Sequence, residues 1–580
     1  MKPTNIKWLS RCLIASLAFV SFSSCSDDHF DINSTNASGT LWENLLATQK
    51  CDSFAMILQK TIVNKKDYGI PSTLTYDNLL KSTKVLTVWA PQDGSYNAAH
   101  WLNLLEQGDN ETVETQFVAN HIAYFNYNGS YPVVKKILLA NSKFATYDDA
   151  AATNTFNSVP ILNDPAYKNI ASTNGTLHVL DGASSFYYNL REILSVYPEL
   201  SDLYKYVESR DTLVFLPGAS TPGTTVNGEI HYVDSVFLEY NKVYPIISTN
   251  EDSLSAAILP GNEAWAEALA KVSQSFNYKD NYYYFDYNRS TTTPQVDSIK
   301  SDSVREARTV NAIFNNMFYS LNEQPAFDVT TASPTTVANF FATSDSLVST
   351  AYYNRNYLYH QHAPECNELA EGKTPYEASN GYAFITDHFN FKANKSWQFD
   401  IYFDAEDSRY YDAENSKNIG SYANHQVTPG TRNDSVKGTV RGNYYREFVP
   451  SAPSSKEQIT YKIPDVMSGT YDIYAVIVPE NIIDPSMTTA RYNMFTATLA
   501  YDFLPNGRPV TFANTKEMHS DPTKVDTVLL FENFKFPYAY AGLPNAKPYI
   551  TLNSTYTRSK RLVATPYFYI DCFILKSKDE

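Results

Sequence analysis

The alternation of apolar and polar residues divides the chain into two regions that differ in their predicted secondary structure. Residues 38–391 combine amphipathic helical segments with short apolar runs bounded by Gly, Pro and Asn. After Lys395 the apolar residues recur with a period of two, beginning with Trp397–Asp404, and no convincing helix of ten residues follows. A period of two is typical of half-buried strands. The pattern therefore predicts mixed α/β domains followed by an all-β module, most economically a two-sheet antiparallel sandwich.

Two distant pairs of segments within residues 38–391 share a pattern. Asn174-Gly175 and Asn380-Gly381 each precede an apolar run that ends in Asp. Upstream, Leu86–Tyr96 and Ser255–Trp265 each place a strand, a turn containing proline and a helix start in the same order. Asn-Gly before an apolar run indicates a tight turn that leads into a strand. We therefore predict two divergent copies of one domain, with equivalent turns at the two Asn-Gly pairs and at Pro91 and Pro260.

The first segment of each copy is also predicted to begin a helix. Leu41–Leu46 is a predicted amphipathic helix, and the spacing of Thr40 and Glu43 is that of a capping box. Pro198–Tyr204 is the segment that we align with it in the second copy.

The N-terminus has the parts of a secretion signal. Lys2, Lys7 and Arg11 precede a short apolar run that ends in Ser-Ser-Cys25. The run is shorter than the roughly 20 apolar residues that span a bilayer. It resembles the lipobox of bacterial lipoproteins, which implies that Cys25 is the lipidated first residue of the mature chain; the alternative is an ordinary cleaved signal with an incidental cysteine. Ser26-Asp27-Asp28 resembles the surface-export tag of Bacteroidetes lipoproteins, or is simply the start of a solvated tether.

The motifs of the first copy resemble the fasciclin-type adhesion domain. They are Thr87–Pro91, Asn120-His121-Ile122 and Asn174–Asp181, which includes His178. The resemblance implies a compact α/β unit built around a β-sandwich, with adhesion or ligand binding as its usual role. The integrin-reading motifs of animal members are not evident, so no animal-type partner is implied.

The second copy departs from the family pattern at several positions. Leu259 replaces the alanine before Pro260, Asn316 stands where His121 aligns, and Phe384 replaces His178. Its motifs are also farther apart, and the longer interval holds Tyr282–Phe285 and a Ser/Thr-rich stretch at 288–303.

The last third resembles jelly-roll or galactose-binding-like modules, on the pattern of Ser468–Tyr471 and the closing Tyr569–Leu575. The predicted fold is thus two fasciclin-like α+β domains followed by an all-β sandwich. The predicted boundaries are a signal peptide at 1–24, a lipidated tether at 25–37, fasciclin-like domains at 38–188 and 189–391, and the sandwich at 392–580.

Charge and cysteine content narrow the classes of function. The 62 acidic and 46 basic residues give a formal charge of −16, which argues against nucleic-acid binding. Cys51, Cys366 and Cys572 are widely spaced and include no C-x-x-C pair, so they predict neither a disulfide framework nor a zinc site. We interpret them as buried thiols.

A search for catalytic motifs is negative. The chain has no G-x-S-x-G, H-E-x-x-H, P-loop or G-x-G-x-x-G sequence, and we predict no catalytic, cofactor or metal residues. His121 and His178 are interpreted as histidines that are hydrogen-bonded inside the domain. The cluster Asp404, Glu406 and Asp407 could bind calcium, although a solvated loop is favoured. A pair of acids for glycoside hydrolysis would be revealed only by their separation in space.

Candidate ligand-binding residues lie in the C-terminal module, which is farthest along the chain from the anchor. Aromatic rings in loops can stack on sugar faces, and loops on a rigid scaffold often carry binding residues. The candidates are Trp397, Tyr410, Tyr411, Tyr444 and Tyr445. The alternative is that these rings pack at the corners between strands.

A recurring triplet of Asp, Ser or Thr, and an aliphatic residue resembles the O-glycosylation acceptor of Bacteroidetes. The alternative is that Asp-Ser and Asp-Thr serve as turn and cap residues. The candidate acceptors are Thr212, Ser235, Ser253, Ser298, Ser303, Ser346, Ser435 and Thr527.

Together these features predict a non-catalytic lipoprotein of the outer-membrane surface that binds an extracellular glycan. It would act as an accessory to an outer-membrane uptake complex of the starch-utilisation type. The alternatives are an adhesin or spacer that binds a protein on host or neighbouring cells, and an unrecognised glycoside-active enzyme. Exposed aromatic residues on a concave face of the C-terminal module would favour the first, a flat polar surface the second, and two facing acids in a cleft the third.

Overall fold

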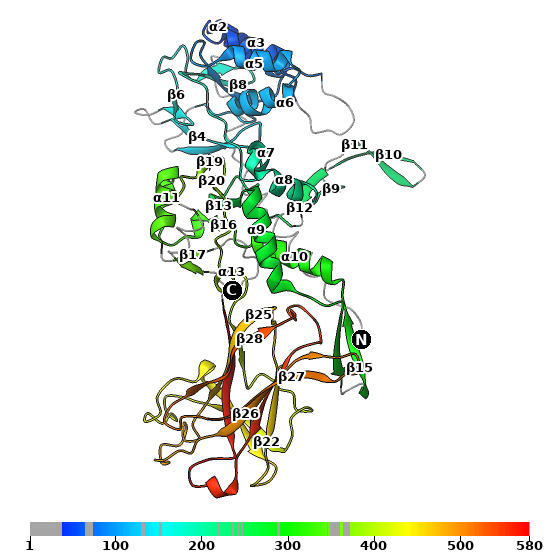
Figure 1. Cartoon of the computed structure of the whole chain (residues 1–580). Coiled ribbons are helices and arrows are strands. Elements are labelled where there is room, and N and C mark those ends of the chain that lie inside the picture. Colours follow the sequence, from blue (N-terminus) through cyan, green and yellow to red (C-terminus); the bar gives the residue numbers. More distant parts are fainter. Residues whose placement is uncertain are drawn as a thin grey trace.

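The protein is multidomain and of mixed α/β content, with three lobes arranged in a row (Figure 1). The computed structural model describes residues 37–578, with gaps at 64–72, 129–133, 150–153, 219, 227, 235–236, 242, 245–247, 287–289, 345, 349–359, 363–369 and 371. Cys25 and the preceding signal lie outside the described residues. No described helix is long and apolar enough to cross a membrane.

The first lobe packs helices against a four-stranded sheet of order β2–β1–β8–β7, with a second sheet of order β3–β4–β5–β6 beside it. Its helices are α2 (Leu41–Ala47), α3 (Asp52–Lys60), α4 (Tyr76–Lys81), α5 (Ala98–Glu106) and α6 (Asn110–Val113). Its strands are β1 (Leu86–Pro91), β2 (Ile122–Ala123), β3 (Lys135–Leu138), β4 (Phe144–Asp148), β5 (Thr155–Phe156), β6 (Val159–Pro160), β7 (Ile170–Ser172) and β8 (Gly175–Leu180). The capping box of Thr40 and Glu43 is present at the start of α2.

The second lobe repeats the central sheet in the order β16–β13–β20–β19. Its helices are α7 (Ile193–Val196), α8 (Ser201–Glu208), α9 (Asn262–Ser273), α10 (Ser301–Phe314) and α11 (Pro334–Thr343). The sheet strands are β13 (Ser255–Pro260), β16 (Phe318–Ser320), β19 (Tyr376–Ala378) and β20 (Gly381–Thr386). Two-stranded elements are added by β9 (Asp211–Phe215), β10 (Thr221–Val226), β11 (Glu229–Asp234), β12 (Phe237–Asn241), β14 (Asn281–Asp286), β15 (Ser290–Ser298), β17 (Ser346–Val348) and β18 (His360–His362).

The predicted equivalence of the two Asn-Gly pairs is confirmed by the strand pairing. Strand β8 runs parallel to β1 with Gly175 opposite Leu86, and β20 runs parallel to β13 with Gly381 opposite Ser255. Pro91 and Pro260 are also equivalent, although each ends its strand and does not lie in a turn.

The two asparagine side chains hold the same position in the two copies. Asn174 accepts a hydrogen bond from the backbone N–H of Leu41 (2.8 Å) and donates to the carbonyl oxygens of Leu80, near the end of α4, and Ser82, just after it. Asn380 accepts from the N–H of Leu190 (2.9 Å) and likewise donates to two carbonyl oxygens of the loop before β13. Each asparagine therefore ties the start of its copy to the central pair of strands.

One alignment made from the sequence is wrong. The counterpart of Leu41 is Leu190, because the backbone N–H of each donates to the asparagine of its copy's Asn-Gly pair. The segment from Pro198 lies one helix later. Asn262 accepts from the N–H of Asp202 at the start of α8, as Asp93 accepts from the N–H groups at the start of α3. Two amphipathic helices of similar length have the same pattern of apolar residues, so the sequence alone does not show which of them matches α2. This explains why the alignment was displaced by one helix.

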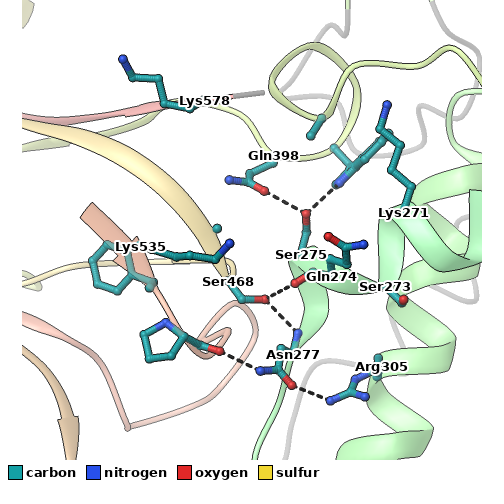
Figure 2. Close-up of a pocket in the computed structure, with 15 residues that line it drawn as sticks. Lys271, Ser273, Gln274, Ser275, Asn277, Arg305, Gln398, Ser468, Lys535 and Lys578 are labelled. Carbon is teal, nitrogen blue, oxygen red and sulfur yellow. Dashed lines mark hydrogen bonds between the residues drawn. The ribbon is translucent and has the colours of Figure 1, made fainter. Parts of the chain in front are cut away.

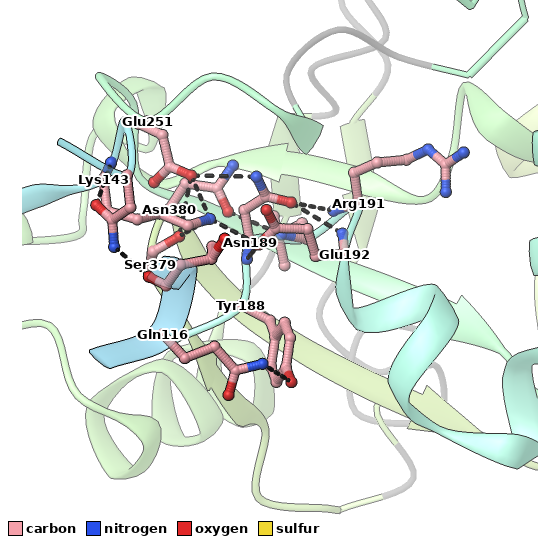
Figure 3. A network of polar contacts seen from close by, with 12 residues as sticks. Gln116, Lys143, Tyr188, Asn189, Arg191, Glu192, Glu251, Ser379 and Asn380 are labelled. Atoms are coloured by element: carbon pink, nitrogen blue, oxygen red, sulfur yellow. Dashed lines mark hydrogen bonds and ion pairs between the residues drawn. The ribbon is translucent and has the colours of Figure 1, made fainter. Parts of the chain in front are cut away.

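The first and second lobes meet at a buried lysine (Figure 3). Lys143, 6% exposed, donates to Glu192 (2.7 Å), Glu251 (2.8 Å) and Ser379 (3.2 Å) of the second copy. Asn189 donates to both of these carboxylates. A single cation from the first copy is thus held by two acids of the second, and this polar cluster connects the two lobes.

Residues 397–578, which are described throughout, form two antiparallel sheets without an α-helix, as the period-two pattern predicted. One sheet has the order β22–β23–β30–β25–β28, with β21 also paired to β30; the other has the order β24–β29–β26–β27. The short helix α13 (Ala393–Ser396) precedes them. The strands are β21 (Ile401–Asp404), β22 (Ile419–Gln426), β23 (Tyr444–Pro450), β24 (Gln458–Lys462), β25 (Gly469–Ile477), β26 (Met494–Phe503), β27 (Pro509–His519), β28 (Asp526–Phe536), β29 (Tyr549–Ser554) and β30 (Phe568–Ser577).

The main core of the sandwich is continuous with that of the second copy, and two smaller clusters, around Val436 and Met494, belong to the sandwich alone. One hydrophobic cluster runs from Leu190 through the second copy to Leu575, whereas the first copy has separate clusters. Trp397 lies in this continuous core and donates its indole N–H to Ser275 of the second copy (3.0 Å). The predicted boundary near residue 392 therefore marks a change of secondary structure within one packed unit.

Candidate functional site

A groove crosses the outer face of the sheet β24–β29–β26–β27 and is bordered by the hairpin β14–β15 from the second copy. Two adjoining cavities form it, with volumes of about 350 and 570 Å³. Phe285 of the hairpin lines both, and Lys462 of one cavity is paired in the sheet with Tyr549 of the other. Figure 1 shows the hairpin beside the sandwich, attached to the green second lobe. The site thus combines two lobes of the protein.

The floor of the groove is a ladder of polar side chains that are hydrogen-bonded to one another. Thr460 and Thr551 face each other on neighbouring strands, and their hydroxyl oxygens are 2.9 Å apart. Asn553 Nδ2 donates to Thr498 Oγ1 (3.0 Å), and Gln458 Nε2 donates to Asn553 Oδ1 (3.2 Å). The period of two explains the ladder, because the intervening residues point into the core. The mutual hydrogen bonds fix these side chains in place before any ligand arrives.

Aromatic side chains form one wall of the groove. Tyr284 and Phe285 come from β14, and Tyr410 and Tyr411 come from the loop after β21; all four are partly exposed. Gly507 contacts the Phe285 ring so closely that a Cβ there would lie 2.3 Å from Cζ. The glycine therefore makes room for the aromatic residue at the centre of the site.

The hairpin is held against the sandwich by several specific contacts. Tyr282 donates its hydroxyl to the carbonyl oxygen of Ala539 (2.7 Å), and Lys279 forms an ion pair with Asp502. The Asp297 carboxylate accepts from the backbone N–H groups of Asn545 (3.0 Å) and Ala546 (2.8 Å). These contacts anchor both strands of the hairpin, so the aromatic wall is positioned by folded structure.

Basic side chains outnumber acids around the groove. The basic residues are Arg409, Lys417, Lys462 and Lys547, and the acids are Asp412 and Glu414. Asp412 accepts hydrogen bonds from the backbone and side-chain amides of Asn415, which define the loop. Burial lowers the pKa of Lys547, and its ammonium donates to the carbonyl oxygen of Leu543 (2.7 Å).

The structure places the aromatic candidates in different environments. Tyr410 and Tyr411 line the groove. Trp397 and Tyr445 are 4% and 2% exposed and pack in the interior, so the interpretation of these two rings as stacking surfaces is not supported. Tyr444 is 40% exposed on β23 but does not line the groove.

Sequence reasoning missed the hairpin and the polar ladder as parts of one site. Tyr282–Phe285 was visible as an aromatic run within the insertion of the second copy, and this was the available signal. The ladder residues are the polar positions of strands whose other positions are apolar, so their outward direction was predictable. Their convergence with the insertion depends on the packing of two lobes.

Comparisons with known proteins add little to this geometry. No protein-family model matches the chain, and no curated protein matches it. Among solved structures, a xanthan lyase of Paenibacillus is similar over 34% of this chain and 16% of that chain, with 14% identity and a TM-score of 0.16. A likeness of this extent assigns neither fold nor function.

The two histidines of the first copy serve the structure, as interpreted from the sequence. His121 donates from Nδ1 to the carbonyl oxygen of Phe117 (2.6 Å) and accepts at Nε2 from the N–H of Ser184 (2.9 Å). His178 donates from Nε2 to the carbonyl oxygen of Tyr127 (3.0 Å). Burial lowers the pKa of each histidine to about 4, so both are neutral at physiological pH.

Asn316 takes the role of His121 in the second copy. It donates from Nδ2 to the carbonyl oxygens of Ala312 (2.7 Å) and Ser396 (3.0 Å). In both copies the side chain bonds the carbonyl four residues earlier and the segment that leaves the domain. A neutral amide thus replaces a neutral imidazole, which agrees with a packing role.

Two acids of the cluster at the end of β21 are paired with arginines. Asp404 pairs with Arg441, and Asp407 pairs with Arg409 (2.6 Å). Among the described residues, no group of three or more His, Cys, Asp or Glu side chains could hold a metal ion. Each of these two carboxylates is therefore neutralised by an arginine.

A buried acid, Asp571, lies near this cluster. Burial raises its pKa to about 7, and its Oδ2 accepts from the backbone N–H of Arg441 (2.9 Å). Burial also raises the pKa of Glu406. Neither acid lines the groove, so they do not form a facing pair within it.

The remaining predicted features can be placed briefly. Cys51 and Cys572 are buried free thiols, as predicted, and Cys366 lies outside the described residues. Burial raises the pKa of the Cys51 thiol to about 12. Five of the candidate O-glycosylation residues are exposed: Thr212, Ser298, Ser303, Ser435 and Thr527. The Ser253 hydroxyl is buried and therefore inaccessible in the folded protein, whereas Ser235 and the side chain of Ser346 lie outside the described part.

A buried acid just before Gln458 in the chain is expected to make the stability of the protein depend on pH. Glu457 is fully buried, and burial raises its pKa to about 7 from an ordinary value of 4.5. The folded protein therefore holds a proton that the unfolded chain releases, so this contribution to stability is present below about pH 4.5 and is lost as the pH rises through 7.

We expect Glu457→Gln to remove about 2 kcal/mol of the decrease in unfolding free energy between pH 5 and pH 8. Urea unfolding at several pH values measures it. The exposed Glu414→Gln is the control and should leave the profile unchanged. Parallel profiles for Glu457→Gln and the unsubstituted protein would contradict the assignment.

Proposed function

We propose that the protein is a non-catalytic, lipid-anchored surface protein that binds an extracellular glycan in the groove between β24–β29–β26–β27 and the β14–β15 hairpin. The observation that carries the proposal is the hydrogen-bonded ladder of Thr, Asn and Gln side chains next to a wall of Tyr and Phe rings. Sugars present hydroxyl groups along their edges and apolar C–H faces. A polar floor and an aromatic wall match these two kinds of surface.

The rigidity of the site supports binding of an extended ligand. The ladder side chains bond one another, and the hairpin is fixed to the sandwich through Tyr282, Lys279 and Asp297. A preorganised site loses less side-chain entropy on binding, which favours affinity. Ligand sites often lie where two structural units meet and combine apolar rings with a few placed polar groups.

The remaining lobes fit a role as a spacer on a cell surface. We interpret the two copies as fasciclin-like domains and the C-terminal part as a jelly-roll-like sandwich. With Cys25 acylated in the outer membrane, both copies would separate the groove from the lipid. The protein would then present captured glycan to an uptake complex of the starch-utilisation type.

The test is binding by the soluble protein from residue 30 onward. A glycan array identifies a ligand, and calorimetry measures its affinity. We expect Tyr410→Ala and Phe285→Ala each to raise the Kd at least tenfold, about 1.4 kcal/mol, because truncation of a central aromatic contact typically costs more than 1 kcal/mol.

Tyr444→Ala is the matched control, because Tyr444 is exposed on the same module but lies outside the groove. It should change the Kd less than twofold. Equal losses for Tyr410→Ala and Tyr444→Ala would place recognition elsewhere. Absence of any array signal, together with binding to a protein partner, would favour the adhesin alternative.

A further inference from the structure

A third cavity, separate from the two that form the groove, lies at the junction between the second copy and the sandwich (Figure 2). Its volume is about 400 Å³. It is lined by the end of α9 and the turn that follows, by α10, and by the sandwich edge that includes β25, β28 and the residue after β30. The groove and this cavity have no lining residue in common.

The charged side chains that line the cavity are all cations. No Asp or Glu lines it among the described residues, although the chain as a whole carries a formal charge of −16. Lys578 forms an ion pair with Asp472 (2.5 Å). The four cations are Lys271, Arg305, Lys535 and Lys578. Like charges gathered around a partly enclosed space raise the free energy of the empty site and favour entry of an anion.

Neutral oxygens hold two of these cations in place. Lys271 donates from Nζ to the carbonyl oxygen of Phe391 (2.8 Å), and Arg305 donates from Nη2 to the side-chain oxygen of Asn277 (2.6 Å). These hydrogen bonds orient the groups without neutralising them. Each cation keeps its full charge and further N–H donors.

A buried amide supplies an additional donor. Trp397 donates its indole N–H to Ser275 Oγ (3.0 Å), so the Ser275 hydroxyl hydrogen is free to donate to Gln398 Oε1 (2.8 Å). This chain fixes the orientation of the Gln398 amide (Figure 2). Gln398 is 3% exposed, and its Nε2 makes no hydrogen bond of normal geometry, although the Tyr471 hydroxyl lies nearby. A buried donor without an acceptor is costly, and an anion would satisfy it.

We propose that this cavity binds an oxyanion carried by a small molecule: a carboxylate, sulfate or phosphate group on a body no larger than about two sugar rings. The volume lies within the range of small-ligand sites. Charge-assisted hydrogen bonds from ammonium and guanidinium groups to such an anion are stronger than neutral ones. Because the donors come from the second copy and from the sandwich, the bound anion also links these two parts.

Trp397 gives the site its own signal, since it lines the cavity and its N–H is part of the donor chain. The soluble protein from residue 30 onward is titrated with sodium phosphate, sodium sulfate or sodium glucuronate at constant ionic strength, with glucose as the neutral control. We expect a saturable change in tryptophan fluorescence and a higher midpoint of thermal unfolding with at least one anion, and neither with glucose. The ranking of the three anions distinguishes phosphate, sulfate and carboxylate ligands.

Three charge-removing variants locate the response. Lys535→Gln and Lys578→Gln should weaken anion binding at least fivefold, and Lys578→Gln, near the end of the chain, remains usable if Lys535→Gln impairs folding. Lys516→Gln, an exposed lysine on β27, removes the same charge and should change affinity less than twofold. Trp397→Phe should abolish the fluorescence change but keep the thermal shift. No saturable response to any of the three anions, or equal weakening by Lys516→Gln, would overturn the proposal.

Discussion

Gly175→Ala is expected to unfold the first copy, and Gly381→Ala the second. A Cβ at Gly175 would lie 1.7 Å from the carbonyl oxygen of Leu86, and one at Gly381 would lie 1.8 Å from that of Ser255. These contacts are with the backbone of the paired strand, so no side-chain rotation can relieve them. Both glycines also have positive φ, at +141° and +157°. We expect each substitution to lower the free energy of unfolding by about 4 kcal/mol or more, at the upper end for single substitutions.

The matched control is Gly94→Ala. Gly94 also has positive φ, at +77°, but a Cβ there would meet nothing within 4 Å. It should cost only about 1 kcal/mol, the ordinary penalty of the left-handed region for a residue with a side chain. Thermal unfolding of the three variants separates the cost of a positive φ, which all three share, from the cost of the steric clash with the paired strand, which only Gly175→Ala and Gly381→Ala have. Equal effects of Gly94→Ala and Gly175→Ala would show that the close approach of β8 to β1 does not determine stability.

The isolated C-terminal region is expected to be far less stable than a self-contained β-sandwich, which is what its period-two sequence pattern predicts. Residues 393–580 on their own would expose the part of the shared core that packs on the second copy, including Trp397, and would lose every contact with the β14–β15 hairpin. A loss of about 4 kcal/mol or more corresponds to a fall of about 10 °C in the unfolding midpoint, since roughly 2–4 °C accompanies each kcal/mol in a domain of this size.

The comparison uses three fragments. Residues 189–580 retain the shared core and should unfold cooperatively. Residues 38–188 have hydrophobic clusters of their own and should also fold alone. Residues 393–580 should be sensitive to limited proteolysis and unfold at a lower temperature. A cooperative transition of 393–580 at the midpoint of 189–580 would refute the shared-core interpretation.

The sequence predicted the repeated unit because its signals are local. An Asn-Gly pair fixes a backbone shape within a few residues, so Asn174-Gly175 and Asn380-Gly381 could be matched without knowledge of the fold. The change to a period of two after Lys395 likewise reports local strand structure. The opening helices of the two copies were aligned wrongly, with Pro198 in the place of Leu190. Which helix of one copy matches which helix of the other depends on hydrogen bonds to residues that are distant in the chain, and a local pattern does not show these.

The candidate site was only partly predictable for the same reason. Tyr410 and Tyr411 could be selected from their polar surroundings, whereas the burial of Trp397 depends on Ser275, which is 122 residues away in the chain. An aromatic residue in a polar stretch looks the same whether it faces solvent or another lobe. The wall formed by Tyr284 and Phe285 arises from an insertion in a different domain, and no pattern within the sandwich strands points to it.

The unequal joints between the lobes have a mechanical consequence. The second copy and the sandwich share one core, so we expect them to move as a single lever arm, whereas the polar cluster around Lys143 is the place where the molecule can pivot. If the groove holds a glycan polymer, as proposed, tension on that polymer would turn the second copy and the sandwich together about Lys143 and leave the distance between the hairpin and the sheet unchanged. A protein anchored as proposed would then follow a moving polymer while the shape of its binding groove stays constant.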